Sequence, residues 1–157
     1  MQWLNELSAD WARQGMSVQP GCTAHELQRW EQHGIRLPQE FRRYFAQANG
    51  MDPFTATGTD KRGFYFYALS ELQFYPQVVD FALEPPVPAL AGKKCLLFAD
   101  YMHKSWWYGL LFAGAAYSVI EIAAPNTYAV VADSFREFVH LYLADADELY
   151  SARATRP

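Results

Sequence analysis

The sequence lacks the features that mark nucleic-acid-binding, disulfide-stabilised and membrane-spanning proteins. Its 13 basic residues are outnumbered by 17 acidic ones, and the net charge of −4 gives no cationic surface for a phosphate backbone. The two cysteines, Cys22 and Cys95, form no C-x-x-C pair and are typical of small buried apolar residues. No apolar run approaches the ~18 residues of a membrane span, and the first residues lack a signal-peptide pattern. We therefore expect a cytoplasmic protein that binds neither nucleic acid nor membrane.

Common catalytic and metal-binding motifs are also missing. The chain has no G-x-S-x-G, no P-loop, no G-x-G-x-x-G and no H-E-x-x-H sequence. None of its four histidines forms an i, i+4 pair, and His25 and His33 are too far apart on a straight helix to share a metal ion. We expect no cofactor, no metal and no catalytic residues, although missing motifs weaken an enzyme hypothesis without excluding it.

What the chain does contain is a high proportion of rings and other apolar side chains. Half of its 157 residues are hydrophobic (51%), and they include 5 Trp, 10 Tyr and 11 Phe. This composition excludes a disordered chain and predicts a core or a partner surface rich in aromatic residues. The length fits one domain, which we place at residues 1–150, followed by a frayed tail at residues 151–157.

Apolar side chains at helical spacing predict helices in the first third of the chain and near its end. The predicted helices are residues 3–14, residues 24–33, a segment that starts at Pro38, and a segment that follows Ser134. Two of them begin with the spacing of a capping box, Thr23 with Glu26 and Ser134 with Glu137. Asn49-Gly50 is a typical stop for the third helix.

The middle of the chain predicts strands. Residues 63–69 form an aromatic, β-prone run, and residues 70–72 can form a short helical turn. After a proline-rich connection at residues 84–88, turn signals separate four short apolar runs, at residues 93–100, 105–114, 116–123 and 126–132. The expected fold is α+β: a single domain with N-terminal helices and a C-terminal helix packed around a mainly antiparallel sheet of about 4–6 strands.

A polar cluster lies between the first two of these runs. Asp100, His103, Lys104 and Ser105 crowd one predicted turn and could form an acid–base group or a binding loop. Alternatively, Asp100 and Ser105 hold the turn through bonds to the backbone, while His103 and Lys104 face solvent. Both interpretations remain open from the sequence.

Three rings follow this turn directly. On a strand, Trp106 and Tyr108 point to one face and Trp107 to the other. We expect at least one ring to lie outside the core, where an exposed Trp can anchor an interface. Core packing of all three rings is the alternative.

Acidic residues are unevenly distributed along the chain. Residues 63–92 contain Glu71, Asp80 and Glu84 with no Lys or Arg, and residues 133–150 contain five acids with one Arg. Such asymmetry could steer a cationic partner, although a solvated acidic face is a simpler explanation. The predicted partner-binding residues are Asp100, Tyr101, His103, Trp106, Trp107, Tyr108, Asp80 and Glu84.

The order of these segments resembles the SUKH superfamily, bacterial relatives of the yeast cell-wall-assembly regulators. The likeness covers roughly residues 24–150. Its most specific part is Leu37-Pro38 followed by an aromatic helix and Asn49-Gly50, and the S-F-R-E-F helix that contains Phe135 and Phe138 is the second. The resemblance implies an α+β fold without catalytic residues, and it assigns these positions to the fold.

Many bacterial members of this superfamily are thought to be immunity proteins that neutralise a cognate toxin by binding it. The resemblance thus implies a non-catalytic protein-binding domain whose partner is a toxin, which the acidic charge predicts to be basic. A regulatory or scaffolding module with an endogenous partner is the alternative. A small hydrolase or nuclease that uses Asp100 and His103 is a third hypothesis. The sequence does not determine the oligomeric state or the toxin class.

Overall fold

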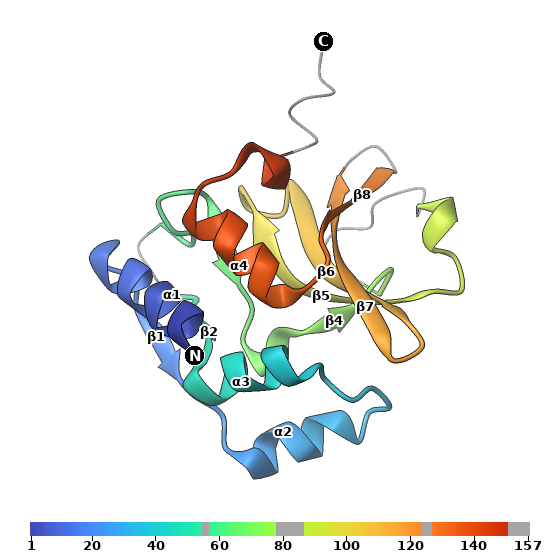
Figure 1. Ribbon diagram of the computed structural model, residues 1–157, viewed down its shortest axis with the longest axis horizontal. Coiled ribbons are helices and arrows are strands. Elements are labelled where there is room, and N and C mark those ends of the chain that lie inside the picture. The colour runs from blue at the N-terminus through green and yellow to red at the C-terminus, as the bar shows by residue number, and fades with distance from the viewer. Residues whose placement is uncertain (55–56, 78–86, 124–126, 151–157) are drawn as a thin grey trace.

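The computed structural model describes residues 1–54, 57–77, 87–123 and 127–150, and its helices lie close to their predicted positions (Figure 1). Within these residues the α-helices are α1 (Gln2–Arg13), α2 (Ala24–Glu31), α3 (Gln39–Gln47) and α4 (Phe135–Leu143). Short 3-10 turns add η1 (Leu69–Glu71), η2 (Pro88–Leu90) and η3 (Asp147–Tyr150). No helix in the described ranges is long and apolar enough to cross a membrane.

Both predicted capping residues begin their helices. The Thr23 hydroxyl accepts the Glu26 N–H at 3.2 Å, and the Glu26 carboxylate accepts the Thr23 N–H at 2.7 Å, which completes a capping box. The Ser134 hydroxyl accepts the Glu137 N–H at 3.1 Å, but the Glu137 carboxylate accepts the N–H of Asp133 instead of that of Ser134. The second helix therefore has the predicted cap without the reciprocal bond of a box.

A two-stranded sheet, which the sequence did not predict, pairs the segment after α1 with the segment after α3. Strand β1 (Val18–Pro20) pairs antiparallel with β2 (Ala48–Met51), so that Asn49-Gly50 lies within a strand and not at a helix stop. A Cβ atom at Gly50, whose φ is +71°, would lie 2.6 Å from the carbonyl carbon of Tyr67. The Asn49 side-chain oxygen accepts the Leu69 N–H at 2.7 Å. The Asn-Gly pair thus ties β2 to the next segment, because only glycine allows this close approach.

The larger sheet contains the predicted meander. Its strands over the described residues are β3 (Phe64–Phe66), β4 (Gln73–Phe74), β5 (Lys94–Tyr101), β6 (Trp106–Ala113), β7 (Ala116–Ala123) and β8 (Thr127–Ala132). They run in the order β3-β5-β6-β7-β8, with β4 also paired to β5, and all pairs are antiparallel. This arrangement confirms the α+β fold class and the meander of four adjacent strands.

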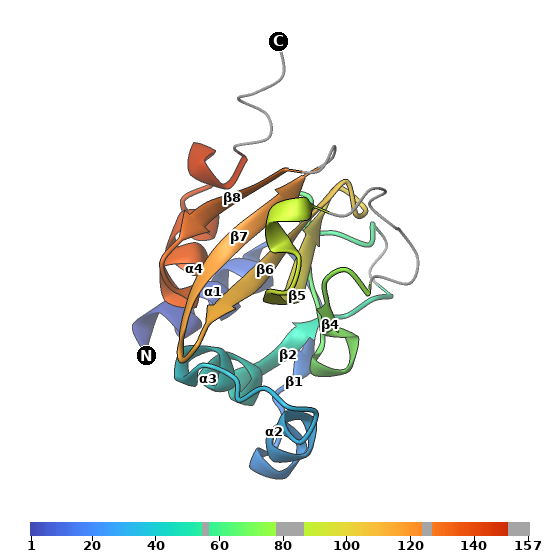
Figure 2. The ribbon, with the colours of Figure 1, turned by 90° about the vertical axis from the view of Figure 1, so that its right-hand side faces the viewer.

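Both faces of the larger sheet are covered. Figure 2 shows α1 and α4 on one side of the sheet and η2 on the other. On the helical side, Phe98 of β5 packs against Phe41 of α3 and Phe138 of α4, with ring centroids 5.7 and 5.1 Å away. On the opposite side, Val87 and Leu90 cover a second cluster, which contains Tyr67, Tyr75, Cys95, Leu97, Trp107, Ile120 and Ile122. A strand in this sheet therefore buries its side chains on both faces, and not only every second one.

The two cysteines occupy these interiors as the sequence predicts. Cys22 and Cys95 are both free and buried. Burial raises the pKa of Cys22 to about 11 and that of Cys95 to about 12. Both thiols are therefore protonated at neutral pH, as expected for structural residues.

Candidate functional site

The turn between β5 and β6 has a left-handed backbone over three residues. Met102, His103 and Lys104 have φ angles of 47°, 53° and 64°, although none of them is glycine. The left-handed conformation costs roughly 1–2 kcal/mol for each such residue. A run of this kind persists only where surrounding contacts fix the backbone, and such sites are often functional.

Four hydrogen bonds fix this turn. The Asp100 carboxylate accepts the Lys104 N–H at 3.2 Å, and the Ser105 hydroxyl donates to the Met102 carbonyl at 2.8 Å. The Ser105 N–H donates to the Tyr101 carbonyl at 3.0 Å, and the Met102 N–H donates to Gly63 at 2.8 Å. The interpretation of Asp100 and Ser105 as turn-holding residues is confirmed.

Asp100 is buried and engaged at both of its oxygens. Its second oxygen accepts the Tyr67 hydroxyl at 2.8 Å, and 3% of the residue is exposed. Burial raises the pKa of Asp100, although the bonds from Tyr67 and from the Lys104 N–H oppose the rise. His103, by contrast, is exposed. These contacts favour the turn interpretation over a hydrolase in which Asp100 and His103 act together, because the carboxylate is committed to the fold.

The rings after the turn lie on the predicted faces of β6 but are all buried. Trp106 and Tyr108 belong to the core beneath the helices, and Trp107 belongs to the second cluster. Trp106, Trp107 and Tyr108 are 7%, 2% and 0% exposed, so the expectation that at least one of these rings lies outside the core is wrong. The reason is that Val87 and Leu90 cover the face of the sheet to which Trp107 points.

Tyr101 and Trp106 close the base of the turn. Their rings stack with centroids 4.3 Å apart, and the Trp106 indole N–H donates to the Tyr108 hydroxyl at 2.9 Å. The Tyr108 hydroxyl in turn donates to the carbonyl of Leu149 in η3. The predicted ring cluster therefore forms a rigid support for the turn, and its role in binding a partner remains a prediction.

The accessible part of the site, which we call the tip patch, consists of Met102 and His103. Met102 is 51% exposed, and His103 is exposed as well. A Cβ atom at Gly58 would lie 3.5 Å from Cε1 of His103, so Gly58 lies against the imidazole. The tip patch thus presents one apolar and one polar side chain at this end of the sheet. The predicted rim residues Asp80 and Glu84, much of the proline-rich connection and the predicted tail lie outside the described residues.

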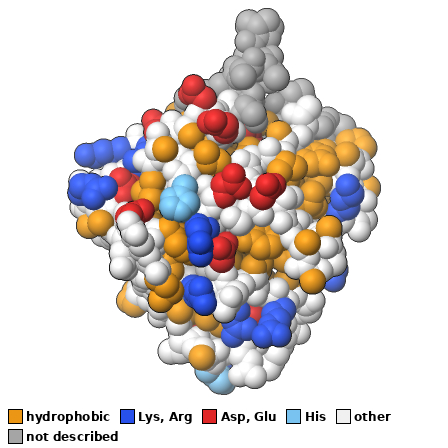
Figure 3. All heavy atoms as spheres, viewed as in Figure 1, with side chains coloured by type: hydrophobic (Ala, Val, Ile, Leu, Met, Phe, Trp, Pro, Cys, Tyr) orange, Lys and Arg blue, Asp and Glu red, His pale blue; other side chains and the backbone are white. Residues whose placement is uncertain are grey.

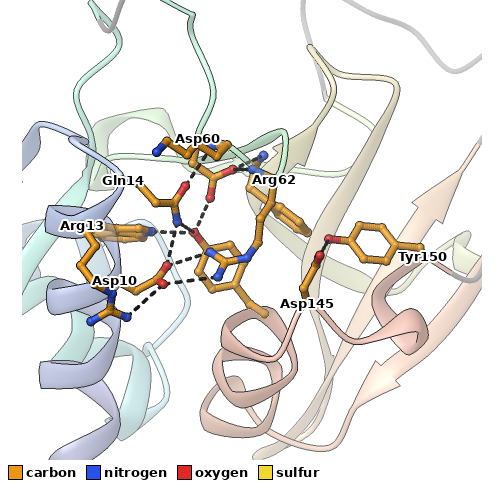
Figure 4. Close-up of polar contacts among 11 residues, drawn as sticks. Asp10, Arg13, Gln14, Asp60, Arg62, Asp145 and Tyr150 are labelled. Atoms are coloured by element: carbon orange, nitrogen blue, oxygen red, sulfur yellow. Dashed lines mark hydrogen bonds and ion pairs between the residues drawn. The ribbon is translucent and has the colours of Figure 1, made fainter.

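A buried ionic network, which the sequence analysis missed, joins the loop before β3 to α1 and α4. Figure 4 shows Asp10 and Arg62 facing each other, with Gln14 and Asp60 beside them. The Arg62 guanidinium donates to both oxygens of Asp10, at 2.7 and 3.3 Å, and its carbon lies 4.8 Å from the centroid of the Tyr142 ring. The Tyr142 hydroxyl donates to Asp60.

The pKa values of the two carboxylates in this network shift in opposite directions. Burial raises the pKa of Asp60 despite the bond from Tyr142. Burial would also raise the pKa of Asp10, but hydrogen bonds from Arg62 and Gln14 and the charges of Arg62 and Arg13 lower it overall. The sequence carried one signal: Asp10 lies three residues after Leu7 and beside Trp11, on the apolar face of its helix. The network fixes residues 57–63, against which the tip patch rests.

Other chemistry at the described residues is limited. They contain no group of three or more His, Cys, Asp or Glu side chains that could hold a metal ion. The polar clusters that they do contain, around Asp100 and around Arg62, are held together by hydrogen bonds inside the fold.

Comparison with known proteins agrees with the fold and with the resemblance drawn from the motifs. A search of curated proteins finds no match to this sequence. The model of the SMI1 / KNR4 family (SUKH-1) matches residues 21–140, a range that contains Leu37-Pro38, the Asn49-Gly50 pair and most of α4. Since this range is more than half of the chain, the protein belongs to the SMI1 / KNR4 family (SUKH-1).

Proposed function

We propose that this chain is an immunity-type protein that binds a cognate bacterial toxin in the cytoplasm and neutralises it by covering its active surface. The observation that carries the proposal is the match to the SUKH-1 family model over residues 21–140, because this is a family of immunity-type proteins. Neutralisation by occlusion needs no cofactor and no catalytic group in the inhibitor.

The tip patch is the part of the predicted site that supports contact with a partner. Exposed Met102 offers apolar surface, and His103 beside it adds a polar ring. Because the left-handed turn is already fixed by Asp100 and Ser105, little conformational entropy is lost when a partner binds. Asp100, Tyr101, Trp106, Trp107 and Tyr108 then act from beneath, as supports.

Acidic side chains next to the tip patch favour a basic toxin. Asp147 and Glu148 of η3 are exposed, and η3 packs beside the turn through Tyr150, whose ring centroid lies 5.4 Å from that of Tyr101. Figure 3 shows carboxylates gathered over α4 and η3. A negative field at this end would speed the encounter with a cationic partner, and salt would screen it. Asp80 and Glu84 remain predicted contributors to this rim.

A protection assay tests the proposal. A candidate toxin domain taken from the neighbouring genes is expressed in bacteria with the wild-type chain, with an empty vector, or with a Met102→Ala/His103→Ala variant. The proposal predicts growth only with the wild-type chain, and a complex of the two proteins in gel filtration. Growth arrest despite soluble wild-type chain contradicts it. Capture of a host protein in place of the toxin favours the regulatory alternative.

A further inference from the structure

A groove with basic walls lies at the end of the larger sheet opposite the tip patch. Two hollows of about 350 and 270 Å³ adjoin there, and both are lined by Gly34, Ile35 and Lys94. We call their union the basic groove. Lys94 begins β5 and Tyr101 ends it, so the basic groove and the turn are separated by about 23 Å of strand.

The charge of the basic groove is opposite to that of the whole chain. Arg36 lines the first hollow, Lys93 the second and Lys94 both, and His33 adds a group that can be protonated. None of the described residues that line either hollow is Asp or Glu. Arg36, Lys93 and Lys94 are exposed, and over the described ranges no ion pair or hydrogen bond engages their side chains. On a protein of net charge −4, this is a local concentration of cations that no described carboxylate neutralises.

Two carboxylates on the helices beside the groove, Glu31 and Glu40, pair with arginines outside it. Glu31 binds the Arg42 guanidinium at 3.0 Å and accepts the Leu37 N–H at 3.1 Å. Glu40 pairs with Arg136 at 3.4 Å. The bonds of Glu31 also fix the segment between α2 and α3 that forms one wall. The groove is therefore preformed, and its positive charge is not cancelled by these neighbours.

Apolar surface lies between the charges. Ile35 is buried in the floor, and the half-buried rings of Phe74 and Phe112 line the second and first hollow. The backbone N–H groups of Gly34 and Lys93 donate to carbonyls within the fold, so they do not converge on a bound anion as in a phosphate site. A groove that has separate cations with apolar contacts between them is complementary to a polypeptide segment whose carboxylates are spaced along its length.

We propose that the basic groove binds an acidic polypeptide segment of a partner protein. Its Asp or Glu side chains pair with Arg36, Lys93 and Lys94, and apolar side chains between them contact Phe74 and Phe112. This site is separate from the tip patch and has the opposite charge preference, so it recruits a different partner or a different part of the same one.

Binding of synthetic peptides to the full chain tests this proposal. The probe is a short fluorescein-labelled peptide that alternates Glu with Leu, and the matched probe alternates Gln with Leu. Arg36→Glu/Lys94→Glu is compared with Arg43→Glu/Lys61→Glu, which changes the net charge equally at exposed residues outside the groove. The proposal predicts saturable binding of the Glu peptide alone, at least about tenfold weaker in the groove variant and little changed in the control.

Four outcomes would overturn the proposal: no binding of the Glu peptide, equal loss in both variants, equal binding of the Gln peptide, or displacement of the peptide by an equimolar amount of inorganic phosphate. The Met102→Ala/His103→Ala variant should bind the peptide normally, which separates failure of this site from failure of toxin binding.

Discussion

The Tyr67 hydroxyl donates to the Asp100 carboxylate at 2.8 Å and joins the segment after β3 to the end of β5, beneath the exposed turn. The same carboxylate accepts the Lys104 N–H, so one buried side chain links the second core to the left-handed backbone. If the turn contacts a partner as we propose, Asp100 links the stability of the fold to the shape of the binding surface.

Replacement of Asp100 by Ala should lower the free energy of unfolding by about 1–3 kcal/mol, because it leaves the Tyr67 hydroxyl and the Lys104 N–H without their acceptor. Asp100→Asn, which keeps one acceptor and removes a buried charge, should cost less. Urea denaturation of the three proteins measures the difference. Equal stability of wild type and Asp100→Ala would show that the carboxylate does not hold the turn.

Replacement of His103 by Gly should raise stability by about 0.5–1 kcal/mol, because relief at φ 53° exceeds the entropy that glycine adds to the unfolded chain. Gln28→Gly, in the middle of α2, is the control and should lower stability by a similar amount. Thermal melts of both variants show whether each substitution raises or lowers the stability. A loss of stability in His103→Gly would mean that the imidazole itself stabilises the fold.

Trp107 is expected to behave as a core residue. Because it is 2% exposed among Ile120, Ile122 and Tyr67, Trp107→Ala should cost about 3–5 kcal/mol of stability. Any effect of this variant on partner binding would then arise because the ring cluster beneath the turn is disturbed. A variant that melts like the wild type would contradict the two-sided burial of the sheet.

Removal of the two helix caps tests the local structure that the sequence predicted. Thr23→Ala and Ser134→Ala should each lower stability by about 0.5–2 kcal/mol, because each leaves the third amide of its helix without an acceptor. Chemical denaturation provides the measurement, with Thr127→Ala on β8 as a substitution outside any cap. No loss in either variant would show that the caps are unimportant.

The Asp10–Arg62 pair should make stability depend on pH in acid. The pKa of Asp10 in the folded chain lies below the value of about 3.9 that is usual for Asp, so its contribution is complete above that value and is lost as pH falls through the folded pKa. Asp10→Asn should therefore cost about 2 kcal/mol at pH 7, and the difference should shrink between about pH 5 and pH 2. Denaturation midpoints across this range measure it, and a constant difference would contradict the assignment.

The sequence predicted the parts of this fold that depend on local patterns. Apolar spacing, caps and turn signals predicted the helices and the β5–β8 meander, and period-two alternation predicted the opposite faces of Trp106 and Trp107. The burial of the second face of the larger sheet was not predicted, because Val87 and Leu90, which cover it, lie in and beside a three-residue 3-10 turn that has no apolar periodicity. The same limit explains β1, which is only three residues long.

The sequence located the polar turn of the candidate site but did not show which of its side chains are exposed. The polar turn was located from Asp100 and Ser105, whereas the exposure of Met102 depends on the backbone conformation of that turn. The basic groove was not predicted either, since Arg36 and Lys94 are brought together only by the fold. Asp10 was the one missed residue with a visible signal, an acid on an apolar helix face.

Direct titration of the purified chain with the purified toxin domain tests the central claim most closely. The account predicts a saturable one-to-one complex, with affinity at least about tenfold weaker for Met102→Ala/His103→Ala at unchanged melting temperature. Arg43→Glu, away from the tip patch, should bind as the wild type does. Absence of binding by the folded wild-type chain would contradict the immunity function, and unchanged affinity in the double variant would contradict the tip patch as its contact surface.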